Sequence, residues 1–256
     1  MEWAKIYDEI KPYVFRIESE LGYGTGFLLG FNKTHTVAAI ATAAHVIKEA
    51  NDWEKPIKLV HSESNETEFL SNNDRAIWLN DSQDAATIFV NTKDYFPKKP
   101  LSLFDSTKYM RIGIEIGWVG FPRIAPHYLC FFSGKVSYFI EKDNSYLIDG
   151  VAINGVSGGP VFYKTKDGSP EIIGIVSAYI PNKQVGDTLP GLLMARDITP
   201  FHDHLKTIKS IDEAKEKEME TQKQTEKEMQ KGEHSKGSEA TQNEEASDVS
   251  STNSNI

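Results

Sequence analysis

Short apolar segments separated by turn residues fill the first 200 residues of this chain and limit what it can fold into. Each segment is rich in β-branched and aromatic residues and is bounded by Gly, Asn, Asp or Pro, as β-strands are. Almost no helical pattern lies between them, so they predict an all-β sandwich or barrel. The predicted strands are 13–17, 25–31, 36–40, 57–61, 76–79, 85–90, 112–119, 128–140, 145–148, 161–163, 171–180 and 192–198.

A proline-containing break near residues 97–108 divides these segments into two groups of about six. This grouping predicts two packed six-stranded antiparallel β-barrels. Amphipathic spacing predicts a short helix before the barrels, ended by Pro12, and another after them. The expected boundaries are 1–12 for the first helix, 13–209 for the folded domain, about 13–100 and 108–199 for its barrels, and 200–209 for the closing helix.

The composition changes after residue 209. Residues 210–256 are mostly Glu, Lys, Gln, Ser, Asn and Thr, with too few apolar side chains to offset the entropy of ordering. They predict a charged tail, at best a solvated helix and otherwise disordered, whose composition is not expected to fold into a PDZ-like domain. The tail could also dock on a protein partner. The net charge of -9 argues against bulk nucleic-acid binding, although much of it comes from the tail.

A single cysteine, Cys130, rules out an internal disulfide and indicates a reducing, cytoplasmic location. No apolar run approaches the ~18 residues of a membrane span, so none is expected. The N-terminal residues lack the basic and then apolar pattern of a secretory signal. No cofactor is expected. His202 and His204 flank an aspartate, but no cysteine or spaced carboxylate completes a ligand set, so no metal site is expected.

Residues 154–160 have the sequence N-G-V-S-G-G-P, which sets Ser157 among three glycines. Glycine costs backbone entropy, so this density indicates a tight loop whose N–H groups must approach something closely. In acyl-transfer chemistry, such N–H groups hold the oxygen of a tetrahedral intermediate beside the nucleophile. The pattern G-x-S-x-G is not specific by itself, because a glycine-rich turn with a solvated serine also fits it.

A serine nucleophile needs a base, usually an imidazole that a carboxylate holds in the right tautomer. Among the seven histidines, His45 is distinguished by its place after a strand and a run of small residues. The orienting carboxylate must be partly buried, since an exposed one would be screened and mobile. Asp84 directly opens an apolar strand and is the best candidate, with Asp81 and Asp74 as alternatives.

Four blocks occur in order along the chain: G-T-G-F-L at 24–28, A-T-A-A-H-V at 41–46, D-A-A at 84–86 and G-V-S-G-G-P at 155–160. Over roughly residues 13–205 they resemble the trypsin-like, chymotrypsin-fold serine peptidases, closest to the bacterial HtrA/Deg protease domain. An α/β-hydrolase would need the serine before its acid and histidine, and many helices between its strands. We therefore reject that alternative.

The resemblance implies a site in the cleft between two barrels. His45 would act as general base, Asp84 would orient it and Ser157 would attack the substrate. The backbone N–H groups of Gly155 and Ser157 would form the oxyanion hole. The implied substrate is a polypeptide that pairs with the strand carrying Ser177, Ala178 and Tyr179. Val151 and Gly191 would line an uncharged primary pocket that favours an apolar residue before the scissile bond.

Val156 departs from the family pattern, because trypsins commonly have Asp before the serine and the Deg group has Asn. A valine cannot pair with a new N-terminal ammonium, so we expect no proteolytic activation. The oxyanion loop would then be preformed, or set by a partner or substrate. The leading hypothesis is a serine endopeptidase that works through a Ser-His-Asp triad and an acyl-enzyme. The alternatives are a weak or inactive binding module or scaffold, and an adaptor that acts through its tail.

Overall fold

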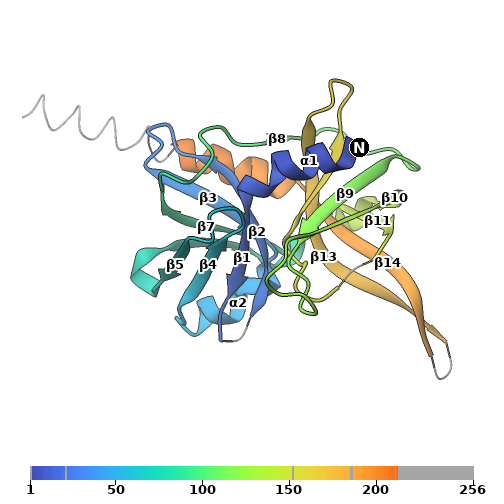
Figure 1. Cartoon of the computed structure of the whole chain (residues 1–256), viewed down its shortest axis with the longest axis horizontal. Helices are drawn as coiled ribbons and strands as arrows, with labels where there is room; N and C mark the ends of the chain where they lie inside the picture. Colours follow the sequence, from blue (N-terminus) through green and yellow to red (C-terminus); the bar gives the residue numbers. More distant parts are fainter. Residues whose placement is uncertain (1, 21, 152, 185–186, 211, 213–256) are drawn as a thin grey trace, which may run out of the picture. The chain divides into compact units, whose positions relative to one another are not determined.

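The computed structural model describes residues 2–20, 22–151, 153–184, 187–210 and 212. Two mostly antiparallel β-sheets dominate this part of the chain (Figure 1). The all-β fold predicted from the sequence is therefore confirmed. The two sheets meet where β2 (Tyr23–Phe31) of the first approaches the second sheet at β9 (Glu115–Gly120) and at residues 154–159, the serine loop.

The first sheet has seven strands in the order β5-β4-β1-β2-β3-β7-β6. Helix α2, Ala44–Asp52, follows β3 directly. The strands are β1 Val14–Glu18, β2 Tyr23–Phe31, β3 Val37–Thr42, β4 Ile57–His61, β5 Thr67–Leu70, β6 Ala76–Asn80 and β7 Ala85–Asn91.

The first sheet is a half-barrel and not a closed one, because the pairings of its described strands leave β5 and β6 as its edges. Arg75 lies in the connection between these edges. Its guanidinium donates from Nη1 to the Leu70 carbonyl at 2.9 Å and from Nη2 to the Ala50 carbonyl at 3.4 Å. A side chain thus satisfies a carbonyl at the end of the edge strand β5, where backbone pairing would otherwise be needed.

The second sheet closes on itself. Its order is β12-β9-β10-β11-β14-β13-β8, and a further pairing of β12 with β13 completes a six-stranded antiparallel barrel. The two-residue strand β8 joins β13 in parallel outside this ring. The strands are β8 Ser102–Leu103, β9 Glu115–Gly120, β10 Cys130–Ile140, β11 Ser145–Asp149, β12 Pro160–Lys164, β13 Pro170–Gln184 and β14 Asp187–Asp197.

Apolar side chains form two clusters. The larger one fills the first sheet and continues across the junction to Phe162 on β12 and Ile175 on β13. The smaller one fills the closed barrel and includes Trp118, Tyr146 and Val156, all fully buried. The serine loop therefore begins inside the core of the second barrel, while the strands behind it pack toward the first.

Helix α1, Glu2–Ile10, crosses the junction between the sheets on one side (Figure 1). Ile6 and Ile10 are buried in the larger cluster, as their helical spacing predicts. The Trp3 ring contacts Phe131 and Phe162 of the second sheet, with centroids 5.4 and 6.2 Å apart. The chain then passes through a single 3₁₀ turn, Lys11–Tyr13, into β1.

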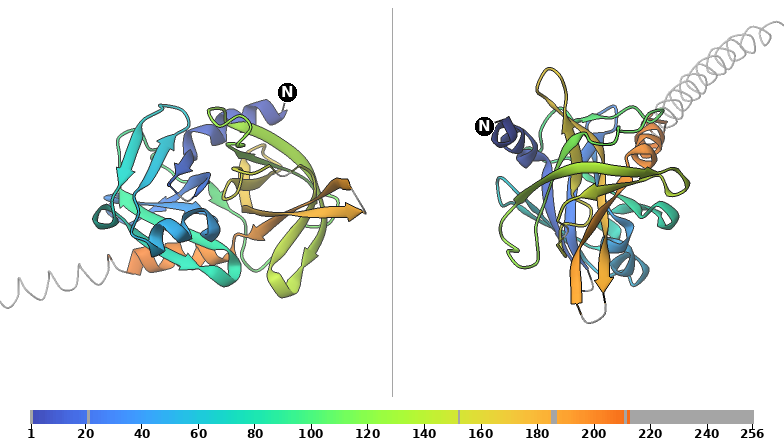
Figure 2. Two further views of the ribbon diagram at one scale, coloured as in Figure 1. Left: turned by 90° about the horizontal axis from the view of Figure 1, so that it is seen from below. Right: turned by 90° about the vertical axis from the view of Figure 1, so that its right-hand side faces the viewer.

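Residues 199–210 form a helix on the opposite side of the junction from α1 (Figure 2). His204 is 3% exposed, stacks on Trp78 at 4.5 Å and shares a 2.7 Å hydrogen bond with the Thr87 hydroxyl. His204, one of the two histidines that flank an aspartate in the sequence, is therefore a packing residue that joins this helix to β6 and β7.

His204 makes the stability of the fold sensitive to acid. Burial lowers the pKa of His204 from 6.5 to about 4. Between pH 6.5 and 4 the unfolded chain therefore binds a proton at His204 and the folded chain does not. Because of this difference, the free energy of unfolding falls by up to about 3 kcal/mol as the pH drops through this window. Urea titrations at pH 7 and pH 4.5 should show this loss. His204→Gln should reduce it.

An exposed histidine supplies the control, because His127→Gln should leave that pH dependence unchanged. His61, whose pKa burial also lowers, adds to the loss in both variants and cancels in the comparison. An equally steep acid loss in His204→Gln would assign the effect to other groups.

Contacts along the chain divide it into two units, Met1–Lys209 and Ser210–Ile256. The charged tail predicted for 210–256 lies outside the described residues except for Ser210 and Asp212. Its role as a tether or docking segment stays a prediction.

Candidate active site

The three predicted catalytic residues come from both sheets. His45 is the second residue of α2, and Asp84 connects the 3₁₀ turn Asp81–Gln83 to β7, so both belong to the first sheet. Ser157 lies in the loop between β11 and β12 of the second sheet. Residues far apart in the sequence are thus carried to the junction of the two sheets.

Asp84 holds His45 through both its side chain and its backbone. His45 Nδ1 lies 2.9 Å from Asp84 Oδ2, and the His45 backbone N–H donates to Oδ1 at 3.0 Å. The Asp84 carbonyl accepts from the Ala44 N–H at 3.1 Å. Helix α2 begins after Ala43, which has no capping side chain, so Asp84 satisfies N–H groups that its N-terminus would leave open.

The surroundings of Asp84 keep it ionised. Burial alone would raise the pKa of this carboxyl, but hydrogen bonds from His45 and Ser177 outweigh burial and hold the pKa below its ordinary value. The Ser177 hydroxyl donates to Oδ2. Because the carboxylate is only 17% exposed, it is also held in place. A fixed negative charge facing Nδ1 favours the tautomer with its proton there, which leaves Nε2 free to accept one.

Glycines make the serine loop possible. Gly155 and Gly158 have φ values of 98° and 82°, a region that L side chains rarely adopt. A Cβ on Gly158 would lie 2.2 Å from both the Thr25 carbonyl and the Thr42 hydroxyl. The glycines that the sequence analysis singled out around Ser157 are therefore required by backbone conformation and by close approach to the first sheet.

Thr25 fastens that loop to the first sheet. Its N–H donates to the Ser157 carbonyl at 2.8 Å, and its hydroxyl donates to the Gly155 carbonyl at 2.9 Å. The same hydroxyl accepts from the Phe121 N–H at 3.0 Å. The sequence indicated the G-T-G block only through family resemblance. These bonds show that its threonine connects the first sheet to the loop around Ser157.

One peptide group sets the direction of the Gly155 N–H, which the sequence analysis assigned to an oxyanion hole. The Asn154 carbonyl accepts from the Arg123 N–H at 2.6 Å and so points toward the β9–β10 connection. In a trans peptide the C=O and N–H point in opposite directions, so the Gly155 N–H is directed away from that connection. Within the described part of the chain, neither the Gly155 nor the Ser157 N–H donates to a backbone carbonyl.

His45 and Ser157 line one pocket of about 320 Å³, together with Gly22, Tyr23, Val46, Arg123, Asn154 and Gly155. His45 is half exposed at its mouth. Within the described residues, the His45 ring hydrogen-bonds only to Asp84, so no bond joins it to the Ser157 hydroxyl in this arrangement. Catalytic hydrogen bonds are often long before substrate binds.

The residues predicted to bind substrate occupy distinct places. Val151 is exposed, and Ser177 is turned inward onto Asp84. Ala178 is partly exposed, while the Tyr179 hydroxyl accepts from the Gly191 N–H. The Val176 backbone still bonds to Gly158 and Gly159 of the serine loop. Beyond Val176, the described pairings of β13 use only its β14 side, so residues 177–180 have an open edge on the other side. The sequence offered no signal for the contact between Ser177 and Asp84.

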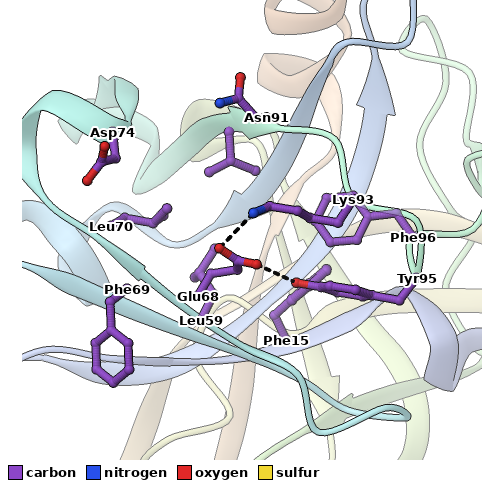
Figure 3. A pocket seen from close by; sticks show the side chains of 11 residues that line it. Phe15, Leu59, Glu68, Phe69, Leu70, Asp74, Asn91, Lys93, Tyr95 and Phe96 are labelled. Carbon is purple, nitrogen blue, oxygen red and sulfur yellow. Dashed lines mark hydrogen bonds and ion pairs between the residues drawn. The ribbon is translucent and has the colours of Figure 1, made fainter.

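A second pocket, of about 260 Å³, lies in the first sheet and shares no lining residue with the first. Phe15, Leu59 and Phe96 contribute apolar surface to it (Figure 3). Glu68 spans it by pairing with Lys93 at 2.9 Å and accepting from the Tyr95 hydroxyl at 3.5 Å (Figure 3). Glu68 and Lys93 are thus paired with each other, and Asp74, the other charged residue of the lining, accepts from the Ser71 hydroxyl.

Two searches of the described residues bear on other functions. No three His, Cys, Asp or Glu side chains in them gather as a metal site. None of their helices is both long enough and apolar enough to span a membrane.

Residues 24–175, more than half of the chain, match the family described as the trypsin-like peptidase domain. No curated protein sequence matches the chain. Among solved structures, Deg5 is similar with a TM-score of 0.56 at 21% identity, over 78% of this chain and 90% of that one. The Rv3671c protease of M. tuberculosis H37Rv, in an inactive form, has a TM-score of 0.55 at 16% identity, over 79% of this chain and 92% of that one. The match to the family confirms the resemblance seen in the sequence, and the chain belongs to the trypsin-like peptidase domains.

Proposed function

We propose that the chain is a serine endopeptidase in which Ser157 is the nucleophile, His45 the general base and Asp84 the group that orients His45. The observation that carries this proposal is the 2.9 Å contact between Asp84 Oδ2 and His45 Nδ1, on a histidine that lines the same pocket as Ser157. Family membership supports a peptidase fold, and this geometry supports the chemistry.

Each proposed step moves one proton. Ser157 Oγ bonds to the carbonyl carbon of the substrate while its proton passes to Nε2 of His45. The C–N bond then breaks, and that proton leaves with the amine, which gives an acyl-enzyme. Water attacks the acyl carbon, gives its proton to His45 and displaces Ser157, which takes the proton back. Asp84 stabilises the imidazolium formed in both halves.

The N–H groups of Gly155 and Ser157 would stabilise the oxyanion in both halves. The outward turn of the Asn154 carbonyl supports this role, because it directs the Gly155 N–H away from the β9–β10 connection. A donor of this kind is worth roughly 3 kcal/mol of transition-state stabilisation.

The open edge of β13 beside Ser177 would pair with an extended substrate segment by strand addition. Unfolded or loop segments of proteins are the natural ligands of such an edge. Val151, uncharged and exposed, would favour an apolar residue before the scissile bond. The single cysteine, Cys130, fits a reducing compartment such as the cytoplasm.

Labelling with a fluorophosphonate probe tests the proposal. We expect covalent capture of the full chain at Ser157, with loss of labelling in Ser157→Ala and in His45→Ala, because the hydroxyl needs its base. Ser137→Ala, at an exposed serine of β10, should label normally.

The second candidate is an inactive binding module, favoured by the missing hydrogen bond between His45 and Ser157. It predicts no labelling at Ser157 while an extended peptide still binds. Absent labelling under conditions where the chain is folded would therefore reject the peptidase.

A further inference from the structure

The pocket beside Ser157 is separate from the edge proposed to hold the acyl part of the substrate. Its walls come from the start of β2, the start of α2, the β9–β10 connection and the serine loop. Neither residues 177–180 nor Gly191 lines it. A peptide whose acyl part lay along β13 would therefore place the residues after the scissile bond in this pocket.

Arg123 is the one permanently charged side chain among the lining residues, and no carboxylate lines the pocket. It is exposed and forms no ion pair with any described residue. The neighbouring cation Arg16, by contrast, already donates to Glu18 at 2.6 Å. An anion that enters the pocket would thus meet a guanidinium without a competing internal partner.

The backbone fixes where this cation stands. The Arg123 N–H donates to the Asn154 carbonyl at 2.6 Å, so its Cα is tied to the serine loop. The charge of Arg123 acts on Tyr23, which lines the same pocket. Burial raises the pKa of Tyr23, and the charges of Arg16 and Arg123 both oppose that rise. Tyr23 is itself held by its hydroxyl, which donates to the Pro126 carbonyl at 3.0 Å.

We infer that Arg123 selects substrates with a carboxylate shortly after the scissile bond, from an Asp or Glu side chain at the second position after it. The inference rests on the proposed function for the direction of the substrate. A guanidinium recognises a carboxylate through charge-assisted, often bidentate hydrogen bonds. A lysine or an amide of the ligand cannot take the place of that carboxylate. A chain-terminal carboxylate offers the same chemistry, and the experiment separates the two sources.

Peptides that differ only at the second position after the scissile bond, Glu or Gln, and carry a C-terminal amide, test the side-chain source. The value of kcat/KM should be about fivefold higher for Glu, the size expected of an exposed charge pair, and the ratio should shrink at high salt. Arg123→Ala should bring the ratio to about one, and Arg123→Glu should make a Lys peptide the preferred one. Arg111→Ala, at another exposed arginine, should keep the original ratio.

A binding measurement keeps the inference testable without turnover. Ser157→Ala should bind the Glu peptide about fivefold more tightly than the Gln peptide, and adding Arg123→Ala should remove the difference. Preference for a Gln peptide with a free C-terminus over both amidated peptides would assign Arg123 to a chain end and overturn the side-chain claim. Equal binding of all peptides, or a ratio that survives Arg123→Ala, would overturn the inference. Cleavage without a Glu preference would reject the role of Arg123 in substrate selection and leave the proposed peptidase activity standing. Failed labelling at Ser157 would reject the peptidase activity itself.

Discussion

Replacing Asp84 with Asn is expected to lower kcat/KM for peptide hydrolysis by about 10⁴-fold while the chain stays folded. An asparagine oxygen can still accept from the His45 backbone N–H, which now bonds to Oδ1 at 3.0 Å, so the start of α2 keeps its cap. The amide nitrogen, however, would present hydrogens to Nδ1, where the carboxylate now lies 2.9 Å away. The imidazole would then carry its proton on Nε2 and could not take the one from Ser157.

Steady-state kinetics on a quenched fluorescent peptide measure the loss, and circular dichroism checks the fold. Histidine ¹⁵N spectra add a readout independent of turnover, because the change of tautomer at His45 should be visible in the inactive chain. Asp81→Asn is the matched control. Asp81 is the alternative acid considered from the sequence, but its carboxylate is exposed and binds Lys48 Nζ at 2.7 Å. A loss below tenfold in Asp84→Asn would mean that another group orients His45.

The sequence located parts of this site by different routes. The glycines around Ser157 are a local signal, because the backbone conformation that they permit is local. His45 and Asp84 were assigned through block order and the need for a base and a buried acid, and the structure brings them into contact. The contact of Ser177 with Asp84 could not be predicted, because it depends on a strand of the second sheet meeting a turn of the first.

The fold likewise divides into features with a local sequence signal and features that depend on distant contacts. Strands with several alternating or β-branched residues were predicted near their observed positions. Thr67–Leu70 is short and largely exposed, and Ser102–Leu103 has only two residues, so neither gave a pattern. The open edge of the first sheet was also unpredictable, because Arg75, which satisfies the end of β5, is itself held by a bond to the distant Ala50 carbonyl. Thr25 similarly links the sheets through bonds that no local pattern encodes.

Val156 shows how the serine loop is anchored without a polar partner. Its side chain is fully buried in the apolar cluster of the second barrel, and a Cβ on Gly120 would lie 2.8 Å from its Cγ1. Trypsins commonly place at this position an aspartate that pairs with a new N-terminal ammonium. Here the anchor is apolar contact, which is available as soon as the barrel folds. This supports the expectation of a loop formed without proteolytic activation.

Val156→Asp is accordingly expected to destabilise the fold by about 3–5 kcal/mol at pH 7, because a carboxylate buried in this cluster would have no charged partner. Val156→Ala is the size control and should cost about 2 kcal/mol through lost packing alone. Urea titrations of both variants in a Ser157→Ala background avoid self-cleavage.

Burial would raise the pKa of the new carboxyl above its unfolded value, so the folded variant takes up its proton first as the pH falls. The deficit of Val156→Asp relative to the parent should therefore shrink from pH 7 to pH 4.5, whereas that of Val156→Ala should stay constant. A constant deficit in Val156→Asp would mean that the loop swings its carboxylate into water. Apolar contact of Val156 would then not be what holds the loop around Ser157 in place.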